Sequence, residues 1–243
     1  MKFKKIAALL GAFTIASSLL IAGCGQEGNS QKAWRVGTDA TYAPFGFKDK
    51  DSGKLAGFDI DIINAIANEE GIEADIQNLN FDALLPALQS NTIDIAISDM
   101  TISEERAKSV DFSKPYYIAG NGLVVNIDNT NINREIASKI PNADVRQFNI
   151  IVDAFLELQN KGVDVVINDT PVNEYYVNGK GKGIAKVTGE DYDAAPLGIA
   201  VKKGNTELLN KINDGLAKIK ANGKYAEIYK KWFGKEPPAE VLR

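Results

Sequence analysis

The chain has 243 residues, a formal net charge of −4, no histidine and a single cysteine. The lack of histidine excludes serine–histidine and cysteine–histidine catalysis and argues against a zinc site. An acidic chain without a basic run argues against nucleic acid as a partner and against electrostatic docking on anionic lipid. We therefore expect neither a metal nor a cofactor.

The first 23 residues have the pattern of a secretory signal peptide. Residues 1–23 open with three lysines and continue as an apolar run, and small residues precede Cys24. A transmembrane anchor is the weaker interpretation, because Gly11 and several polar residues interrupt the run. Removal of this segment takes away three lysines and no acidic residue, which changes the net charge from −4 to −7.

Cys24 ends the sequence IAGC, which resembles the lipobox at which bacterial lipoproteins are acylated on cysteine and cleaved. An ordinary buried thiol is the alternative, but the polar, glycine-bearing residues 24–33 are typical of a tether. A lone cysteine also excludes an internal disulfide framework. The sequence therefore predicts an exported protein, lipid-anchored to the outer face of the cell membrane, or periplasmic in a Gram-negative cell.

The next part of the chain alternates predicted strands and helices. Hydrophobic periodicity and end signals, such as Gly71 after a helix and Ser103 before one, define these elements. The predicted strands are 34–39, 74–80 and 92–98, and the predicted helices lie within 57–71, 81–91 and 103–110. Such alternation predicts an α/β fold with a mainly parallel sheet that helices cover on both faces.

The pattern then changes to two extended segments, 114–125 and 192–204, which flank a small strand–helix set containing VVINDTP. Two further helices follow, within 207–220 and 224–234. This order predicts one lobe interrupted by another, with two extended crossings as a hinge. We expect a first lobe of residues 34–117 and 197–243 and a second lobe of residues 118–196, with a small ligand bound between them.

Several polar and aromatic residues follow predicted strands. Asp39 and Tyr42 follow the first strand, and ISDMTISEER (97–106) follows the third. Ligands of parallel α/β sheets bind beyond the carboxyl ends of the strands. These residues are therefore candidates for a binding site.

The motifs from Trp34 to Gly234 resemble the amino-acid-binding proteins of ABC importers, solute-binding family 3, and most nearly the glutamine-binding proteins. The motifs that carry the resemblance are GTDATYAPFGF, LAGFDIDI, FDALLPALQS, IAISDMTISEER, VDFSKPYY, VVINDTP and GKYAEIYKKWFG. The resemblance implies a two-lobed, type II periplasmic-binding-protein-like fold, a monomer, a free amino acid as ligand and the membrane subunits of an importer as partners.

The resemblance also implies a role for each candidate residue. The position of Arg106 grips the ligand carboxylate, with help from Thr101. The positions of Ser98 and Asp169 receive the ammonium, beside Asn168. Aromatic residues at the positions of Tyr42 and Phe81 flank the ligand side chain, which the position of Asp39 helps to read. A guanidinium suits a carboxylate because it donates two parallel hydrogen bonds, and an ammonium needs acceptors only.

Simpler interpretations remain for the same residues. Arg106 could pair with Glu105 or Asp111 on the surface, and Asp169 could cap a following helix. Tyr42 and Phe81 could be core aromatics.

Asp99 departs from the small residue that the family often has at its position. Its carboxylate could pair with Arg106 in the empty state, or it could favour a cationic ligand such as arginine. The amino acid itself therefore stays open between a glutamine-like and a cationic one.

Enzymes of the same fold, among them amino-acid-like dehydratases and the substrate lobe of lytic transglycosylases, need a general acid or base in the cleft. Glu174 is the only nearby candidate, and its helix position predicts a solvated face. Receptor sensor domains share the fold but continue into a membrane span, which this sequence lacks. We expect a binding protein and no enzymatic activity.

A segment of roughly twenty residues that the family has after the strand GLVVNI has no counterpart near Asn133. In the family this segment supplies a strand and backbone N–H groups for the ligand carboxylate. An internal deletion is one interpretation, and a shortened but sound lobe is the other.

Overall fold

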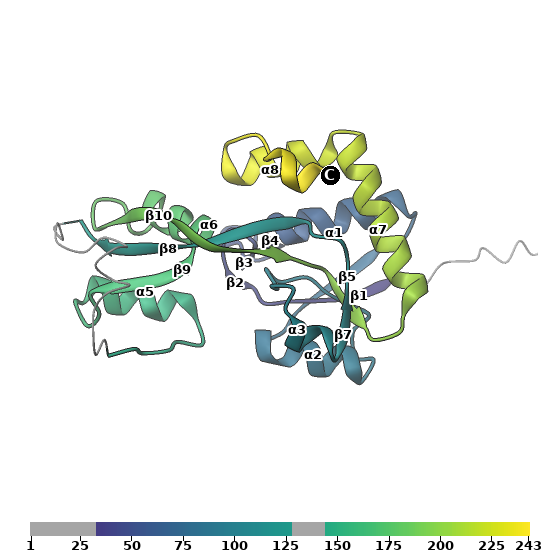
Figure 1. Cartoon of the computed structure of the whole chain (residues 1–243), viewed down its shortest axis with the longest axis horizontal. Helices are drawn as coiled ribbons and strands as arrows, with labels where there is room; N and C mark the ends of the chain where they lie inside the picture. The colour runs from purple at the N-terminus through teal and green to yellow at the C-terminus, as the bar shows by residue number, and fades with distance from the viewer. Residues whose placement is uncertain (1–32, 128–143) are drawn as a thin grey trace, which may run out of the picture. The chain divides into compact units, whose positions relative to one another are not determined.

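The computed structural model describes residues 33–127 and 144–243 (Figure 1). The first lobe of the protein is built on a five-stranded sheet of order β5-β1-β6-β11-β7. Its strands are β1 (Trp34–Thr38), β5 (Ala74–Asn78), β6 (Ile95–Ala96), β7 (Val110–Phe112) and β11 (Ala200–Lys202). Its helices are α1 (Phe58–Glu69), α2 (Phe81–Gln89), α3 (Glu104–Ala107), α7 (Thr206–Ala221), α8 (Lys224–Phe233) and α9 (Ala239–Leu242). A small sheet of β2 (Thr41–Tyr42), β3 (Gly46–Lys48) and β4 (Leu55–Ala56) precedes α1.

The prediction of a mainly parallel sheet is correct for four of the five strands, because β6 and β7 are both antiparallel to β11 and so run in the same direction. β1 runs parallel to both β5 and β6, whereas β11 is antiparallel to β6 and to β7. The exception arises because β11 is formed where the chain returns from the second lobe, so that it enters the sheet in the opposite direction. Alternation of hydrophobic residues does not encode strand direction, so the reversed direction of β11 could not be predicted.

Helices cover this sheet on both faces, as predicted. Ile95 and Ile97 belong to the same apolar cluster as the buried residues of α1 and α7, whereas Ala96 between them packs with Leu84 and Leu88 of α2. Successive side chains of a strand point to opposite faces. The two clusters therefore form the two sides of the sheet, and the strand ends remain free to carry polar groups.

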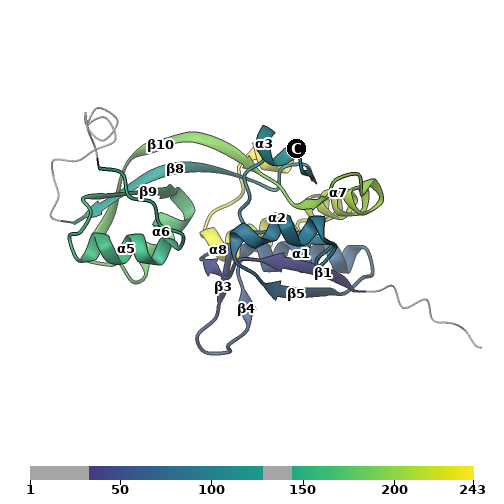
Figure 2. The same ribbon diagram turned by 90° about the horizontal axis from the view of Figure 1, so that it is seen from below.

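Two long antiparallel strands, β8 (Tyr117–Asn126) and β10 (Ala185–Leu197), connect the lobes. They pair from Tyr117 opposite Leu197 to Asn126 opposite Ala185, with shifts of register on either side of Tyr192. Figure 2 shows the two strands side by side along their length. These are the two extended crossings that the sequence predicts.

In the described residues, the second lobe has a three-stranded antiparallel sheet of order β10-β8-β9, with β9 (Val165–Asp169) at one edge. Helices α5 (Ile151–Gln159) and α6 (Thr170–Asn178) pack on it. Apart from Leu242, all the exposed large apolar side chains of the described chain lie between Ile118 and Ile184. The apolar surface of this lobe is therefore less completely covered than that of the first.

Candidate ligand-binding site

Asp39 follows the last residue of β1 and connects three segments at the carboxyl end of the sheet. Its Oδ1 accepts hydrogen bonds from the backbone N–H of Thr41 at 3.0 Å and from the Thr41 hydroxyl at 2.7 Å. Its Oδ2 accepts from the N–H of Phe81, the first residue of α2, at 2.8 Å. The N–H of Asp39 donates to Ser98 Oγ at 3.0 Å. Asp39 thus holds a turn and a helix start in place, and its contact with a ligand side chain stays a prediction.

Arg106 lies on the short helix α3, whose start the sequence predicted. Ser103 is the N-cap, and its side chain accepts from the N–H of Arg106 at 3.3 Å. The guanidinium lies 5.2 Å from the centre of the Phe81 ring, and Nη1 donates to the carbonyl oxygen of Thr101 at 3.0 Å. Burial lowers the pKa of Arg106 from its ordinary value, although the group remains a cation.

The surface ion pairs that could have explained Arg106 are not formed in the described part of the chain. Asp111 pairs with Lys203 at 2.7 Å, and Glu105 is exposed. Thr101, whose carbonyl oxygen holds Arg106, pairs with Leu197 at the end of β10 through an isolated β-bridge. The guanidinium therefore keeps donors that no described carboxylate occupies.

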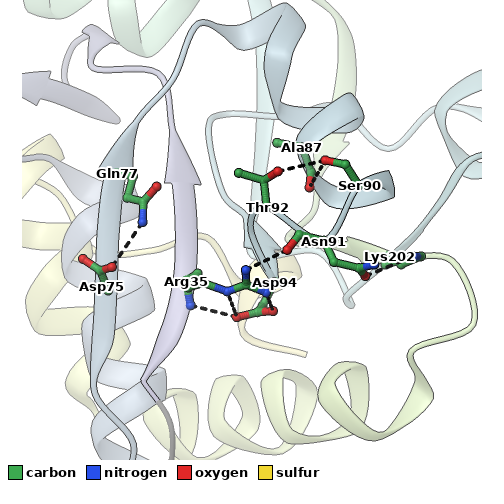
Figure 3. A network of polar contacts seen from close by, with 9 residues as sticks. All are labelled: Arg35, Asp75, Gln77, Ala87, Ser90, Asn91, Thr92, Asp94 and Lys202. Atoms are coloured by element: carbon green, nitrogen blue, oxygen red, sulfur yellow. Dashed lines mark hydrogen bonds and ion pairs between the residues drawn. The ribbon is translucent and has the colours of Figure 1, made fainter.

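A second arginine of the same lobe, Arg35, has a structural role, because its side-chain donors are used in hydrogen bonds within the fold. Arg35 donates from its backbone N–H and from Nε to Asp94 Oδ2, both at 3.0 Å, and from Nη2 to Asp94 Oδ1. Its Nη1 donates to the carbonyl oxygen of Asn91 at 2.7 Å, and Lys202 binds the Asn91 side chain (Figure 3). Arg35 follows the first residue of β1, at the end of the strand opposite Asp39. Its donors are committed to the fold.

Residues of both lobes meet at Tyr42. Its hydroxyl lies 2.6 Å from Asn168 Oδ1 and 2.7 Å from Asp169 Oδ2, at the end of β9. Burial and the neighbouring Asp169 raise the pKa of Tyr42 well above its ordinary value, so the hydroxyl remains a donor. Tyr42 is therefore a polar contact between the lobes as well as an aromatic side chain.

Asp169 occupies the N-cap position of α6, which was the simpler explanation for its presence. Its side chain nevertheless makes no capping hydrogen bond to the helix. It accepts from Tyr42 of the other lobe instead. Asn173, one turn into α6, donates to the carbonyl oxygens of Asn168 at 2.8 Å and of Gly122 at 3.1 Å. These bonds fix the end of β9 while the Asp169 carboxylate faces the first lobe.

Asp99 is the most unusual of the candidate residues. It has a positive φ of 49°, and only 7% of its surface is exposed. Neither carboxylate oxygen has a hydrogen-bond partner among the described residues, so the ion pair with Arg106, one of the two interpretations of Asp99, is not formed. Burial raises the pKa of Asp99 well above its ordinary value, and Asp169 and Asp59 raise it further.

Asp59 is a residue of this region that sequence reasoning missed. It lies in the first turn of α1 and is fully buried. Its Oδ2 accepts from the N–H of Asp99 and its Oδ1 from the hydroxyl of Tyr116, both at 2.8 Å. Burial raises its pKa to about 7. The signal in the sequence was an acidic residue between the two apolar residues Phe58 and Ile60.

The structure thus brings the predicted residues together in three groups. Arg106 lies with Thr101 and Phe81, and Ser98 lies with Asp39. Tyr42, Asn168 and Asp169 form the third group, and the charge of Asp169 helps to raise the pKa of Asp99.

Three further predictions lie outside the described residues, namely the signal peptide at 1–23, the acylated Cys24 and the missing segment near Asn133. Over the part of the chain that is described, no helix has the length and apolar character needed to cross a membrane. No group of histidine, cysteine or acidic side chains suited to a metal ion is found in that part either.

Comparison with known proteins agrees with the resemblance seen in the sequence. The chain is 32% identical over 272 aligned positions to the ABC transporter glutamine-binding protein GlnH of Bacillus subtilis (strain 168), covering 96% of this chain and 97% of that protein. It is 42% identical to the structure of an ancestral arginine-binding protein bound to glutamine, with a TM-score of 0.77 and coverage of 84% and 99%. The crystal structure of the ancestral amino acid-binding protein AncCDT-1, a precursor of cyclohexadienyl dehydratase, is 38% identical, with a TM-score of 0.73 and coverage of 83% and 95%.

The alignment with GlnH spans 272 positions, more than the 243 residues of this chain. That relative therefore has residues for which this chain has no counterpart. The model of the bacterial extracellular solute-binding proteins, family 3, matches residues 34–235, almost all of the described chain. The chain belongs to that family.

Proposed function

We propose that this chain is an extracytoplasmic lipoprotein that captures a polar, glutamine-like amino acid and delivers it to the membrane subunits of an ABC importer. The observation that carries the proposal is the placement of complementary groups on the two lobes. Arg106 of the first lobe offers guanidinium donors without a carboxylate partner among the described residues, and Asp169 of the second lobe offers a carboxylate. A zwitterion needs both groups at once.

In this proposal Arg106 binds the ligand carboxylate, with Thr101 beside it. Ser98 and Asp169 bind the ammonium, and Tyr42 and Phe81 contact the side chain. The first lobe comprises residues 34–117 and 197–243, and the second comprises residues 118–196. Ligand that contacts both lobes favours the closed state, because only a difference in affinity between two states shifts their equilibrium. The protein acts as a monomer, anchored through a lipid on Cys24.

The names of the relatives include binding proteins for glutamine, arginine and histidine, so calorimetry should compare these three amino acids. Glutamine should bind most tightly, and Arg106→Ala should weaken its binding. Absence of binding for every amino acid, even at millimolar concentration, would contradict a transport role for this chain.

A binding-impaired member of the family is the second candidate. Two observations favour it: the alignment with GlnH is longer than this chain, and the exposed large apolar residues gather in the second lobe. Insertion of a family-like segment after Asn133 should then restore tight binding.

A dehydratase is the third candidate, because the similar protein AncCDT-1 is a precursor of such an enzyme. Glu174 is its only nearby acid on α6, and turnover assays with prephenate-like acids would test it.

A further inference from the structure

The carboxyl group of Asp99 has no function in the fold that its contacts reveal. Both of its oxygens are buried and without a hydrogen-bond partner among the described residues. Only the backbone N–H of Asp99 is used, as a donor to Asp59 Oδ2 at 2.8 Å. A buried ionised carboxylate without donors is strongly unfavourable. The group must therefore either hold a proton or receive a cation from outside the protein.

The titratable groups that face Asp99 come from each element around it and supply no cation. They are Asp59 on α1, Tyr42 on β2, Asp169 on β9, Tyr117 on β8 and Tyr116, which precedes β8. Tyr116 donates to Asp59, and Tyr42 donates to Asp169. Neither hydroxyl is bonded to Asp99.

After burial itself, the charge of Asp169 is the strongest influence that raises the pKa of Asp99. Two neighbouring carboxylates cannot both ionise unless a cation lies between them. Asp99 follows β6 in the first lobe and Asp169 ends β9 in the second, so a proton on Asp99 lowers the repulsion between carboxyl groups of the two lobes. An ammonium group bound beside the two carboxyl groups could neutralise their charge in place of the proton.

We propose that Asp99 and Asp169 form a two-carboxylate site in which the ammonium of the amino acid replaces the proton held by Asp99. The proposal rests on the proposed function and adds Asp99 to the residues that contact the ligand. On binding, the O–H bond of the carboxyl group breaks, its electron pair stays on the oxygen, and the proton passes to solvent. The charge at this end of the site is the same before and after, because one cation takes the place of another. Amino-acid binding consequently releases a proton.

The consequence for pH follows from linkage. The free protein binds one proton more than the complex, so affinity rises with pH, by up to about tenfold per unit, until Asp99 of the free protein has lost its proton. Above that point the affinity is constant. Replacing Asp99 by asparagine removes the proton from the exchange but keeps a polar group of the same size, whose amide can donate to Asp169. The variant should therefore bind with an affinity that changes little with pH.

The test uses the chain labelled with ¹³C at its aspartate carboxyl carbons, with the Asp99 signal assigned from its loss in Asp99→Asn. The signal should have the shift of a protonated carboxyl in the free protein and of a carboxylate with excess glutamine or arginine. Titration with each amino acid at several pH values should show the rising affinity in the parent chain and a flat profile in Asp99→Asn. The matched control is Asp75→Asn, at an exposed position on β5, which should retain both effects.

Each outcome decides the matter. An Asp99 signal that remains protonated in the complex, or the same pH dependence in the parent and in Asp99→Asn, overturns the proposal while the binding function stands. Failure of glutamine and arginine to bind at any pH, even in a variant with the family-like insertion, overturns the proposed function and this proposal with it.

Discussion

The hydroxyl of Tyr42 donates to the carboxylate of Asp169 over 2.7 Å, although 127 positions separate the two residues in the chain. The bond joins the lobes at the place proposed for the ligand ammonium. A ligand that takes up Asp169 must therefore compete with Tyr42 or share the carboxylate with it. This hydrogen bond between the lobes stabilises a closed conformation of the ligand-free protein.

Tyr42→Phe should shift the free protein toward the open state. The substitution keeps the ring but removes the donor to Asn168 and Asp169, and a hydrogen bond to a charged group contributes about 1.5–3 kcal/mol. Small-angle X-ray scattering should show a larger radius of gyration for the variant without ligand. Tyr175→Phe, which removes the hydroxyl of an exposed tyrosine on α6, is the control and should leave the scattering unchanged. Equal radii for parent and Tyr42→Phe would contradict the proposed role of the contact.

Arg106→Ala should weaken amino-acid binding by about 2–5 kcal/mol and leave the fold intact, because it removes a charge-assisted pair of hydrogen bonds to the ligand. Arg106→Lys should recover little of the loss, since an ammonium is a point charge without a planar fork. Calorimetry with glutamine measures both. Lys108→Ala, an exposed cation immediately after α3, controls for net charge and should bind normally. An unchanged dissociation constant for Arg106→Ala would place Arg106 outside the site.

Asp59 should make the protein less stable as the pH rises from about 4 to about 7. Its pKa is about 7 in the folded protein against 3.8 as the ordinary value, so the folded state holds the proton over this range and the unfolded state does not. The free energy of unfolding should therefore fall with rising pH, by about 4 kcal/mol in total, and level off above pH 7. Urea unfolding at pH 5 and pH 8 should show a smaller difference in Asp59→Asn than in the parent chain. Asp75→Asn should retain the full difference, and an equal difference in all three would exclude Asp59 as its source.

Cys24→Ala should release the protein from the membrane. The prediction rests on IAGC at the end of an apolar run, because acylation at that cysteine would provide the anchor. Detergent partition of the parent and the variant measures it. A variant that still enters the detergent phase would indicate that residues 1–23 are retained as an anchor.

The second lobe should be the less stable one. Its apolar side chains are more exposed, and its described sheet is smaller, than those of the first lobe. Hydrogen exchange should be faster in β9 and α5 than in β1 and α1. Insertion of a family-like segment after Asn133, a position outside the described residues, should slow exchange in the second lobe only. Equal protection of the two lobes before the insertion would support the alternative of a shortened but sound lobe.

The sequence predicted those features that depend on local patterns. Ser103 before two acidic residues predicted a helix start, and its side chain caps α3. The antiparallel direction of β11 was missed, because hydrophobic alternation is the same in both directions. Asp59 was missed because an acidic residue near a helix start is usually solvated. The surroundings of Asp99 could not be predicted, because they depend on its positive φ and on Asp169 from the other lobe.

The position of β11 between β6 and β7 determines the order in which the molecule can assemble. β6 and β7 precede the second lobe in the chain, whereas β11 follows it, so synthesis from the N-terminus produces the middle strand of this group last. Until about residue 202 is available, β7 has no partner in the sheet, and β6 is paired on one side only. The second lobe, in contrast, contains β8, β9 and β10 in one continuous stretch. The first lobe, whose synthesis begins first, therefore completes its fold last. Its final contacts join residues far apart in sequence, and such contacts form slowly.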